Sequence, residues 1–355
     1  MSSIWEAIVR QFEQQRKFVL ATILSVQGSS PRKVGAKVLI LDNGDVVGTI
    51  GGGLFEANVR DFALNAIEDR TTSRLSFTFH GQDAGSDQMI CGGSVEVLVE
   101  FVHPGSKTKE QIYRRLANSI HERVSTLLIK PVLLEQGQTT KAELDYMCID
   151  ESGATLGDFE NSAVCLKSIP PKRLLKPAQI IFPWDPGSPV LIEWVYPRSI
   201  VYVLGAGHVG ACVCHLASYV DFMVVGIDDR HEYANVDNLP DADEIVVTPF
   251  ENSFEKLCVD RNSFIVIVTR GHAHDKIALA QALKTDAAYI GMIGSKRKIR
   301  LIYDSLIDEG FRESDIGRVH APIGLPIGGE TPHEIAVSIV AEMIQERFKI
   351  LNIQV

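Results

Sequence analysis

The stretch 201–229 constrains the fold of this chain more than any other part of the sequence. It opens with an apolar, β-branched run, 201–204, continues through a glycine-rich loop and a segment with helical character, and ends in a second apolar run, 222–227. The loop glycines stand in G-x-G-x-x-G spacing, as Gly205, Gly207 and Gly210. Strand, loop, helix and strand in this order predict a βαβ unit and hence a parallel sheet.

Each glycine of this loop has a physical reason in a Rossmann unit. Gly205 permits the tight turn from strand to helix, Gly207 lets a pyrophosphate approach the backbone, and Gly210 lets the helix pack closely on the strand. The free N–H groups at the helix start favour an anion, and His208 inside the loop is expected to face the ligand or solvent. Many Rossmann units keep such glycines for packing and bind something other than a nicotinamide nucleotide, so the ligand stays open.

Two charged residues after the second apolar run bear on the choice of nucleotide. Asp228 would accept a hydrogen bond from a ribose 2′-hydroxyl and repel a 2′-phosphate, which favours NAD. Arg230 weakens that preference. NAD(P) is therefore one candidate ligand.

Length and composition bound the class of protein. The 355 residues suffice for two domains, and a formal net charge of -10 predicts no nucleic-acid partner. No apolar run approaches the about 20 residues of a membrane span, and the first residues lack the apolar core of a signal peptide. The six cysteines form neither a disulfide framework nor a zinc pattern, so no metal site is expected. We therefore expect a cytoplasmic protein without a membrane partner.

The first hundred residues predict a mixed α+β arrangement. Helices are expected from Ile4 and over 54–68, and Asn43-Gly44 indicates a hairpin turn. Strands are expected over 18–26, 37–41, 46–50, 75–79 and 95–101.

Two glycine-rich places in this region are candidates for ligand binding. Gly51, Gly52 and Gly53 separate a strand from a helix, where their amides would cradle a phosphate or an electron-rich ring. A tight crossing under another strand is the structural alternative. Cys91 precedes two glycines at the start of a strand, where a ligand could reach its thiolate, although cysteine is more often a small buried hydrophobe.

The middle of the chain predicts a helix over 109–122 and short strands over 125–129, 146–149 and 163–168. A proline-punctuated run follows, and we place the domain boundary near Pro197. The predicted fold class is α/β: a C-terminal Rossmann-like parallel sheet domain over 198–355, preceded by a mixed α+β N-terminal domain over 1–197.

The second domain continues with strands predicted over 244–247, 264–269 and 288–293. After the middle one of these, Arg270 and His272 lie at the carboxyl edge, where open α/β sheets bind ligands. A polar ligand-facing loop, with Asp275 capping a helix over 276–283, is favoured here over a metal site.

The last strand of the sheet and the end of the chain carry further helix starts. The turn Gly294-Ser295-Lys296 would offer an anion a capped helix start and a cation, with a solvated basic helix start as the equal alternative. The final helix begins with a capping box at Thr331. Its expected packing stripe consists of Ile335, Ile339, Met343 and Ile344.

Ordered blocks along nearly all of 5–105 and 198–345 carry a family resemblance. They read GSSPRKVGAK, GTIGGGLFEANV, CGGSVEVLVE, VLGAGHVG, DDRHEYAN, LPDADEIVV, TRGHAHD, YIGMIGSKRK and APIGLPIGGETPHEIAVSIVAEMI. With these blocks the sequence resembles the xanthine dehydrogenase accessory factors, the XdhC/CoxI family. The resemblance implies a chaperone that binds the molybdenum cofactor (molybdopterin), supports its sulfuration and hands it to a molybdenum hydroxylase. It also implies the client hydroxylase and a cysteine desulfurase as partners, and a homodimer is expected.

Two departures limit what this resemblance transfers. Family members commonly carry a cysteine directly after the glycine run, where this chain has Leu54. They often carry arginine-phenylalanine-proline where this chain has Asn238-Leu239-Pro240. Cys91 keeps its family position, which makes it the candidate for chemistry near the metal.

Two hypotheses from different classes follow. The first is a cofactor-handling chaperone in which molybdopterin contacts the Gly51–Gly53 and Gly205–Gly210 turns, with Cys91 near the molybdenum. The second is an NAD(P)-dependent oxidoreductase acting on a small organic substrate. Both need anion-binding turns, so the residues alone do not separate them. The resemblance, and the lack of an evident hydride-transfer acid/base pair outside the histidine loop, favour the first.

Overall fold

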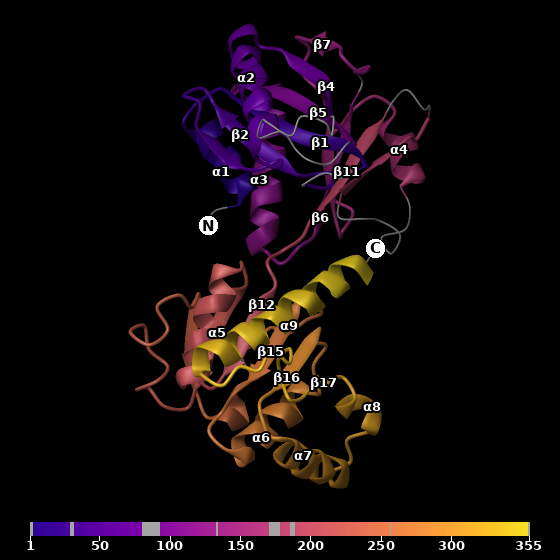
Figure 1. Cartoon of the computed structure of the whole chain (residues 1–355). Coiled ribbons are helices and arrows are strands. Elements are labelled where there is room, and N and C mark those ends of the chain that lie inside the picture. The colour runs from indigo at the N-terminus through magenta and orange to yellow at the C-terminus, as the bar shows by residue number, and fades with distance from the viewer. Residues whose placement is uncertain are drawn as a thin grey trace. The chain divides into compact units, whose positions relative to one another are not determined.

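The structure is a computed structural model that describes residues 3–28, 32–79, 93–132, 134–169, 178–184, 189–255 and 257–353 (Figure 1). The chain forms two compact units, one ending at Pro197 and one spanning Arg198–Ile353. Among the described residues, no helix combines the length and the apolar character needed to cross a membrane.

The first unit contains a six-stranded sheet in the order β3-β2-β1-β5-β4-β7, whose paired strands are antiparallel. Its strands are β1 (Phe18–Gly28), β2 (Lys37–Leu41), β3 (Val46–Gly48), β4 (Thr72–Phe79), β5 (Gly93–Val102) and β7 (Thr139–Thr140). Its helices are α1 (Ile4–Glu13), α2 (Gly53–Asp69) and α3 (Lys107–His121). The predicted hairpin at Asn43-Gly44 is confirmed, because it joins the antiparallel strands β2 and β3.

Alternating side chains of β1 explain why helices cover both faces of this sheet. Phe18 and Leu20 pack into one apolar cluster with α1 and α3, whereas Val19 and Ala21 pack into another with α2. This is the period of two expected for a strand that is buried on both faces.

A second sheet in the same unit has the order β10-β11-β6-β8-β9. Its strands are β6 (Thr126–Pro131), β8 (Met147–Asp150), β9 (Thr155–Gly157), β10 (Ala178–Ile181) and β11 (Val190–Val195). The strand predicted over 163–168 is wrong, because this segment is helix α4 (Ser162–Ser168). A short apolar run does not distinguish the two by itself. Cys165 and Ile169, four residues apart, pack together against this sheet, which is helical spacing.

A charged cluster lies in the interior of the first unit. The Glu100 carboxylate, fully buried, accepts hydrogen bonds from Lys109 (3.1 Å) and Lys130 (2.5 Å). Burial raises the pKa of Glu100, but the two ammonium groups outweigh burial and hold this pKa below its usual value. The Lys130 ammonium also lies 4.5 Å from the ring centre of Tyr146, a distance at which the aromatic ring attracts the buried cation.

The second unit is a six-stranded sheet with all paired strands parallel, in the order β14-β13-β12-β15-β16-β17. The strands are β12 (Ile200–Leu204), β13 (Met223–Asp228), β14 (Glu244–Val247), β15 (Ser263–Ile267), β16 (Tyr289–Met292) and β17 (Val319–His320). The helices are α5 (His208–Tyr219), α6 (His272–Ala282), α7 (Lys296–Asp308), α8 (Glu313–Ile316) and α9 (Pro332–Ile353), with a 3-10 turn, η2 (Phe250–Asn252). The predicted fold class is therefore confirmed.

Helices again cover both faces of the parallel sheet (Figure 1). Val201 and Val203 of β12 pack in a cluster with α5 and α9, and Tyr202 and Leu204 pack in a cluster with α6 and α7. From β12 the chain continues through β13 and β14 on one side of this strand, and it then returns to β15 on the other side of β12. This reversal is the topological switch point at which such sheets bind ligands.

Of the helix predictions, two need correction and one is confirmed. Helix α6 begins at His272, earlier than the predicted start at 276, so Asp275 lies inside its first turn instead of capping it. The capping box of α9 is confirmed, because Thr331 and Glu334 exchange side-chain and backbone hydrogen bonds. Ile344, expected in the packing stripe of α9, is 39% exposed and does not belong to the core.

Candidate functional site

The glycine turn between β12 and α5 has room for a ligand at one glycine only. A Cβ on Gly205 would lie 2.4 Å from the Val268 carbonyl oxygen, and a Cβ on Gly210 would lie 1.8 Å from the Gly205 carbonyl oxygen. A Cβ on Gly207 would meet no described atom within 4 Å. Helix α5 starts at the exposed His208, and its N-cap, Gly207, has no side chain to satisfy the free amides. Gly207 thus presents open backbone at a helix start, where an anion is stabilised.

Asp228 is turned into the protein, toward this same turn. The residue is 1% exposed, and its carboxylate accepts hydrogen bonds from the Ala206 N–H (2.8 Å) and from Nε of Arg230 (3.0 Å). Burial raises the pKa of Asp228, but these hydrogen bonds outweigh burial and lower it overall. In this arrangement the Asp228 carboxylate holds the glycine turn.

Two arginines line the carboxyl edge beside the turn. The Arg270 guanidinium donates to Asp229 (2.7 Å), a residue that the sequence motifs did not single out. The Arg230 guanidinium lies 3.8 Å from the ring centre of Tyr233 and 3.6 Å from Asp229. The side chains of Arg230 and Arg270 are 23% and 47% exposed, so each could exchange part of its contact with a carboxylate for an incoming anion.

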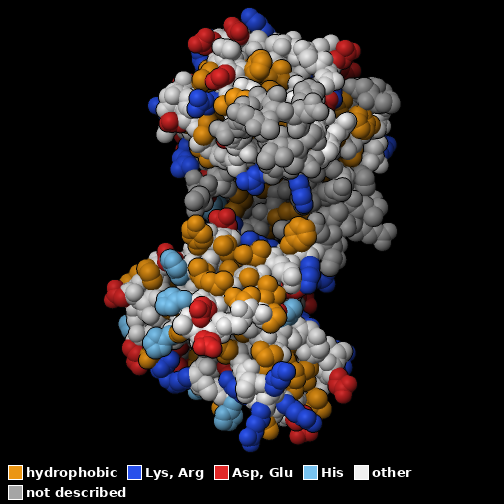
Figure 2. All heavy atoms as spheres, in the orientation of Figure 1, with side chains coloured by type: hydrophobic (Ala, Val, Ile, Leu, Met, Phe, Trp, Pro, Cys, Tyr) orange, Lys and Arg blue, Asp and Glu red, His pale blue; other side chains and the backbone are white. Residues whose placement is uncertain are grey.

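A hollow lies on each side of α7. The larger one has a volume of about 800 Å³ and is lined by several of the residues predicted to bind a ligand. We call this larger hollow, between the starts of α6 and α7, the anion cavity. Lys and Arg side chains gather over these two helices in Figure 2. Its lining includes Gly271, His272, Lys276, Ser295, Arg297 and Lys298.

The wall of the anion cavity is held by a buried carboxylate. Asp275 is fully buried and accepts hydrogen bonds from the N–H (3.2 Å) and the hydroxyl (2.6 Å) of Thr269, and it pairs with the Lys298 ammonium. Ser295 caps α7 by accepting from the Lys298 N–H (3.3 Å). The cavity therefore combines two helix starts with four basic side chains, counting His272, and two of these, Lys276 and Lys298, are paired with carboxylates. The helix starts and the remaining basic groups suit an anionic ligand.

The predicted turn at 294–296 is divided between two hollows. Ser295 faces the anion cavity, whereas Lys296 lines the smaller hollow on the other side of α7. Gly294 packs under α7, where a Cβ would lie 3.3 Å from side-chain carbons of Lys298 and Ile299.

The glycine run of the first unit already holds an anion, and that anion belongs to the chain itself. Gly51, Gly52 and Gly53 all have positive φ angles, 142°, 72° and 62°. They wrap the backbone around the Glu56 carboxylate, which accepts from the Thr49 hydroxyl (2.6 Å) and from the N–H groups of Ile50 (2.9 Å) and Gly52 (3.2 Å). Burial raises the pKa of Glu56, but these hydrogen bonds together lower it overall. The acidic residue in the first turn of the predicted helix was the available signal for this contact.

Three of the described cysteines are buried. Cys91 lies outside the described residues. Burial raises the pKa of Cys148 and Cys165 to about 11 and that of Cys214 to about 12, which leaves these thiols protonated at neutral pH. Cys258 is exposed. Among the described residues, no three His, Cys, Asp or Glu side chains converge as metal ligands.

Fold and site define a protein with an α+β unit and a Rossmann-type unit whose carboxyl edge is lined by cations. A model described as the XdhC Rossmann domain matches residues 201–343, and a model of the XdhC and CoxI family matches residues 12–78. The chain belongs to the XdhC and CoxI family, as the sequence motifs predicted.

Relatives align along almost the whole chain. A Bacillus subtilis protein named as a probable xanthine dehydrogenase subunit is 26% identical over 349 residues, which cover 95% of this chain and 96% of that protein. The uncharacterized protein YqeB of Escherichia coli is 26% identical over 338 residues, 94% of this chain but only 44% of YqeB. A crystal structure of a xanthine dehydrogenase from Bacillus halodurans has a TM-score of 0.78 at 25% identity and covers 98% of this chain and 96% of that one.

Proposed function

We propose that this protein is an accessory factor of a xanthine dehydrogenase-type molybdenum hydroxylase. In this proposal it binds the molybdenum cofactor as cargo, supports its sulfuration and delivers it to the hydroxylase. The observation that carries the proposal is membership of the XdhC and CoxI family in both units, combined with a cation-lined edge on the Rossmann-type unit.

The phosphate of molybdopterin is the group that this edge would bind. Gly207 leaves backbone amides open at the start of α5, and Arg297 supplies positive charge in the anion cavity, where Lys298 is already paired with Asp275. Arg230, Arg270 and His272 lie at the same edge. The Gly51–Gly53 turn is a weaker candidate for the phosphate, because Glu56 occupies its amides and would have to leave first.

Cys91 is the proposed residue for chemistry at the metal. A thiolate is a soft ligand that suits molybdenum or accepts sulfur, and the family motif places this cysteine before two glycines. A cysteine desulfurase as sulfur donor, a homodimer and a cytoplasmic location complete the proposal. The location is supported by the described cysteines, none of which forms a disulfide, as suits a reducing compartment.

The alternative, an NAD(P)-dependent oxidoreductase, has less support. Its ribose contact would require the Asp228 carboxylate, which is buried against Ala206 and Arg230. An accessory role needs only the anion-binding part of the edge.

A retention experiment tests the proposal. The purified protein is offered molybdenum cofactor and NAD separately, and bound pterin and nucleotide are measured after desalting. We expect pterin to be retained and NAD not. We expect Cys91→Ser to retain less cofactor, and Cys258→Ser, at an exposed cysteine, to behave as the wild type.

The same variants are then tested in the host. Without the protein, the client hydroxylase should be synthesised but lack active, sulfurated cofactor; Cys258→Ser should restore it and Cys91→Ser should not. A client with normal activity and normal molybdenum and sulfur content in the deletion strain would contradict the accessory role. Retention of NAD without pterin would support the oxidoreductase instead.

A further inference from the structure

Helix α7 separates the anion cavity from a second hollow, which we call the α7–β17 groove. Lys296, Arg300 and Tyr303 face this groove, whereas Arg297, Lys298 and Leu301 face the anion cavity. The groove has a volume of about 550 Å³. Its α7 side runs from Lys296 to Ile307, which is about 16 Å at the rise of an α-helix.

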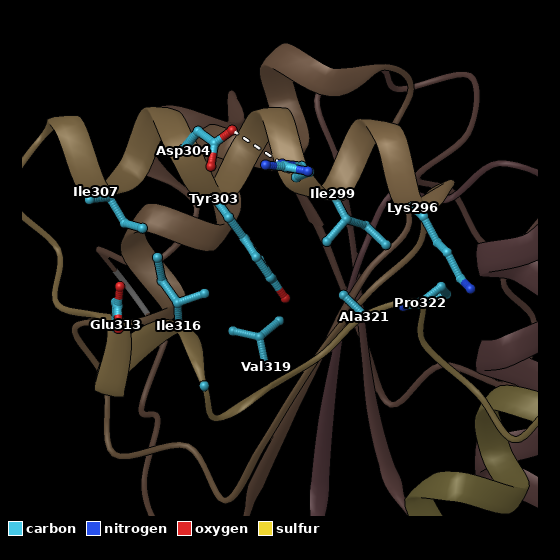
Figure 3. Close-up of a pocket in the computed structure, with 12 residues that line it drawn as sticks. Lys296, Ile299, Tyr303, Asp304, Ile307, Glu313, Ile316, Val319, Ala321 and Pro322 are labelled. Carbon is cyan, nitrogen blue, oxygen red and sulfur yellow. Dashed lines mark ion pairs between the residues drawn. The ribbon is translucent and has the colours of Figure 1, made fainter.

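The floor of the groove is apolar and continuous with the core. Ile299 and Ile316 are 5% and 8% exposed, and Val319 and Ala321 pack against the same cluster. Figure 3 shows these side chains converging from α7, α8, β17 and the residue that follows β17. Such a surface suits a flat apolar ring, because small-molecule sites are mostly apolar with a few polar groups.

Two polar groups project into this apolar setting. In Figure 3 the hydroxyl of Tyr303 points toward the middle of the groove, and the ammonium of Lys296 lies at one end. Burial raises the pKa of Tyr303, so its hydroxyl stays a neutral hydrogen-bond donor. Within the described ranges, neither Lys296 nor Tyr303 has a hydrogen-bond or ion-pair partner for its polar group.

The charges differ between the two ends of the groove. Lys296 is the cation at one end, beside the start of α7, where the helix dipole also favours an anion. Glu313 lies at the opposite end, near Ile307, and Asp304 pairs with Arg300 between them (3.9 Å). A ligand with one anionic group fits this pattern, and a ligand with anionic groups at both ends is repelled by Glu313.

We propose that the α7–β17 groove binds an aromatic monocarboxylate. The carboxylate pairs with Lys296, the ring lies on Ile299, Ile316 and Val319, and the Tyr303 hydroxyl donates to an acceptor on the ligand. This site is separate from the anion cavity of the proposed function and does not depend on it.

Titration calorimetry with three matched probes tests the proposal on the full-length protein. The probes are 2-naphthoate, its neutral analogue 2-naphthylmethanol, and naphthalene-2,6-dicarboxylate, which carries a second anionic group at the far end. We expect 2-naphthoate to bind about fivefold more tightly than the alcohol, the size of a partly solvent-screened ion pair. The dicarboxylate should bind more weakly than 2-naphthoate.

Neighbouring positions on α7 provide matched variants. Lys296→Gln should remove the preference for 2-naphthoate over the alcohol, and Tyr303→Phe should weaken 2-naphthoate. Arg297→Gln, one residue along on the face of the anion cavity, should leave 2-naphthoate binding unchanged. Loss of affinity in Arg297→Gln but not in Lys296→Gln would overturn the proposal, as would equal affinity for all three probes or no binding of 2-naphthoate.

Discussion

At the scale of single residues, the three glycines of the G-x-G-x-x-G loop have different roles. Gly205 and Gly210 are needed for packing, because a Cβ at either would meet a backbone carbonyl. Gly207 is different, because its backbone, at φ −69° and ψ −172°, is open to any residue and its Cβ direction is empty. This difference separates a role in the fold from a role in binding.

Gly207→Val should therefore fold normally and bind poorly. The branched side chain would occupy the space through which a phosphate approaches, and we expect the affinity for the molybdenum cofactor to fall about tenfold, or about 1.4 kcal/mol. Calorimetric titration of the variant with cofactor, beside a thermal unfolding curve, provides both readouts. Equal affinity in variant and wild type would mean that this turn does not hold the anion.

Gly210→Ala is the matched control for this substitution. Its Cβ would lie 1.8 Å from the Gly205 carbonyl oxygen, so the backbone must shift. We expect the free energy of unfolding to fall by about 2 kcal/mol or more. A Gly210→Ala protein as stable as the wild type would contradict the packing role.

At the scale of elements, one carboxylate joins the edge of the parallel sheet to the last helix. Glu342 of α9 accepts from the hydroxyl of Tyr289 (2.6 Å) on β16, from the Gly324 N–H (2.8 Å), and contacts Nδ1 of His320 (3.2 Å) on β17. The ring centres of Tyr289 and His320 lie 4.6 Å apart. The edge strand β17 has only two residues, so these contacts supply much of what holds it in place.

This network predicts a stability that depends on pH. The hydrogen bond to Glu342 raises the pKa of His320, against the effect of burial. A histidine whose pKa is raised by folding stabilises the protein fully below its unfolded pKa of about 6.5, and this stabilisation is lost as the pH rises through the folded pKa. Burial raises the pKa of Glu342, but its hydrogen bonds lower it overall, so the contribution of Glu342 is lost only in acid.

The test is the midpoint of thermal unfolding between about pH 5 and about pH 9. The wild type should lose stability on the alkaline side of pH about 6.5, and His320→Gln should show a flatter profile over this window. Glu346 and Lys349 also act on the charge of His320, so each is checked as a single variant. Parallel profiles for wild type and His320→Gln would contradict the assignment.

At the scale of the whole molecule, each unit has cores of its own. The apolar clusters of the first unit draw only on its own strands and helices, and the two clusters of the second unit lie on the two faces of the parallel sheet. Helix α9 closes one face by packing against α5.

A fragment of residues 198–355 should therefore fold alone. We expect it to keep its helical circular dichroism and to unfold in one cooperative transition, because its cores are complete without the first unit. Removing α9 from the fragment by ending it at residue 330 should abolish that cooperativity. A fragment 198–355 without a cooperative transition would show that the second unit needs the first.

The sequence by itself determined much of the local structure of this protein. The G-x-G-x-x-G loop between two apolar runs, the hairpin at Asn43-Gly44 and the capping box at Thr331 were all predicted, because turn chemistry, periodicity and helix caps act between residues close in the chain. The family was predicted for the same reason, from ordered local motifs.

Only the tertiary structure decided how those motifs are used. In the folded chain the Asp228 carboxylate accepts from the Ala206 N–H, and Ser295 and Lys296 line hollows on opposite sides of α7. The tertiary structure also paired Glu100 with Lys130, thirty residues away. Such contacts depend on which elements pack together, and packing places side chains by burial and charge across distances that no local pattern encodes.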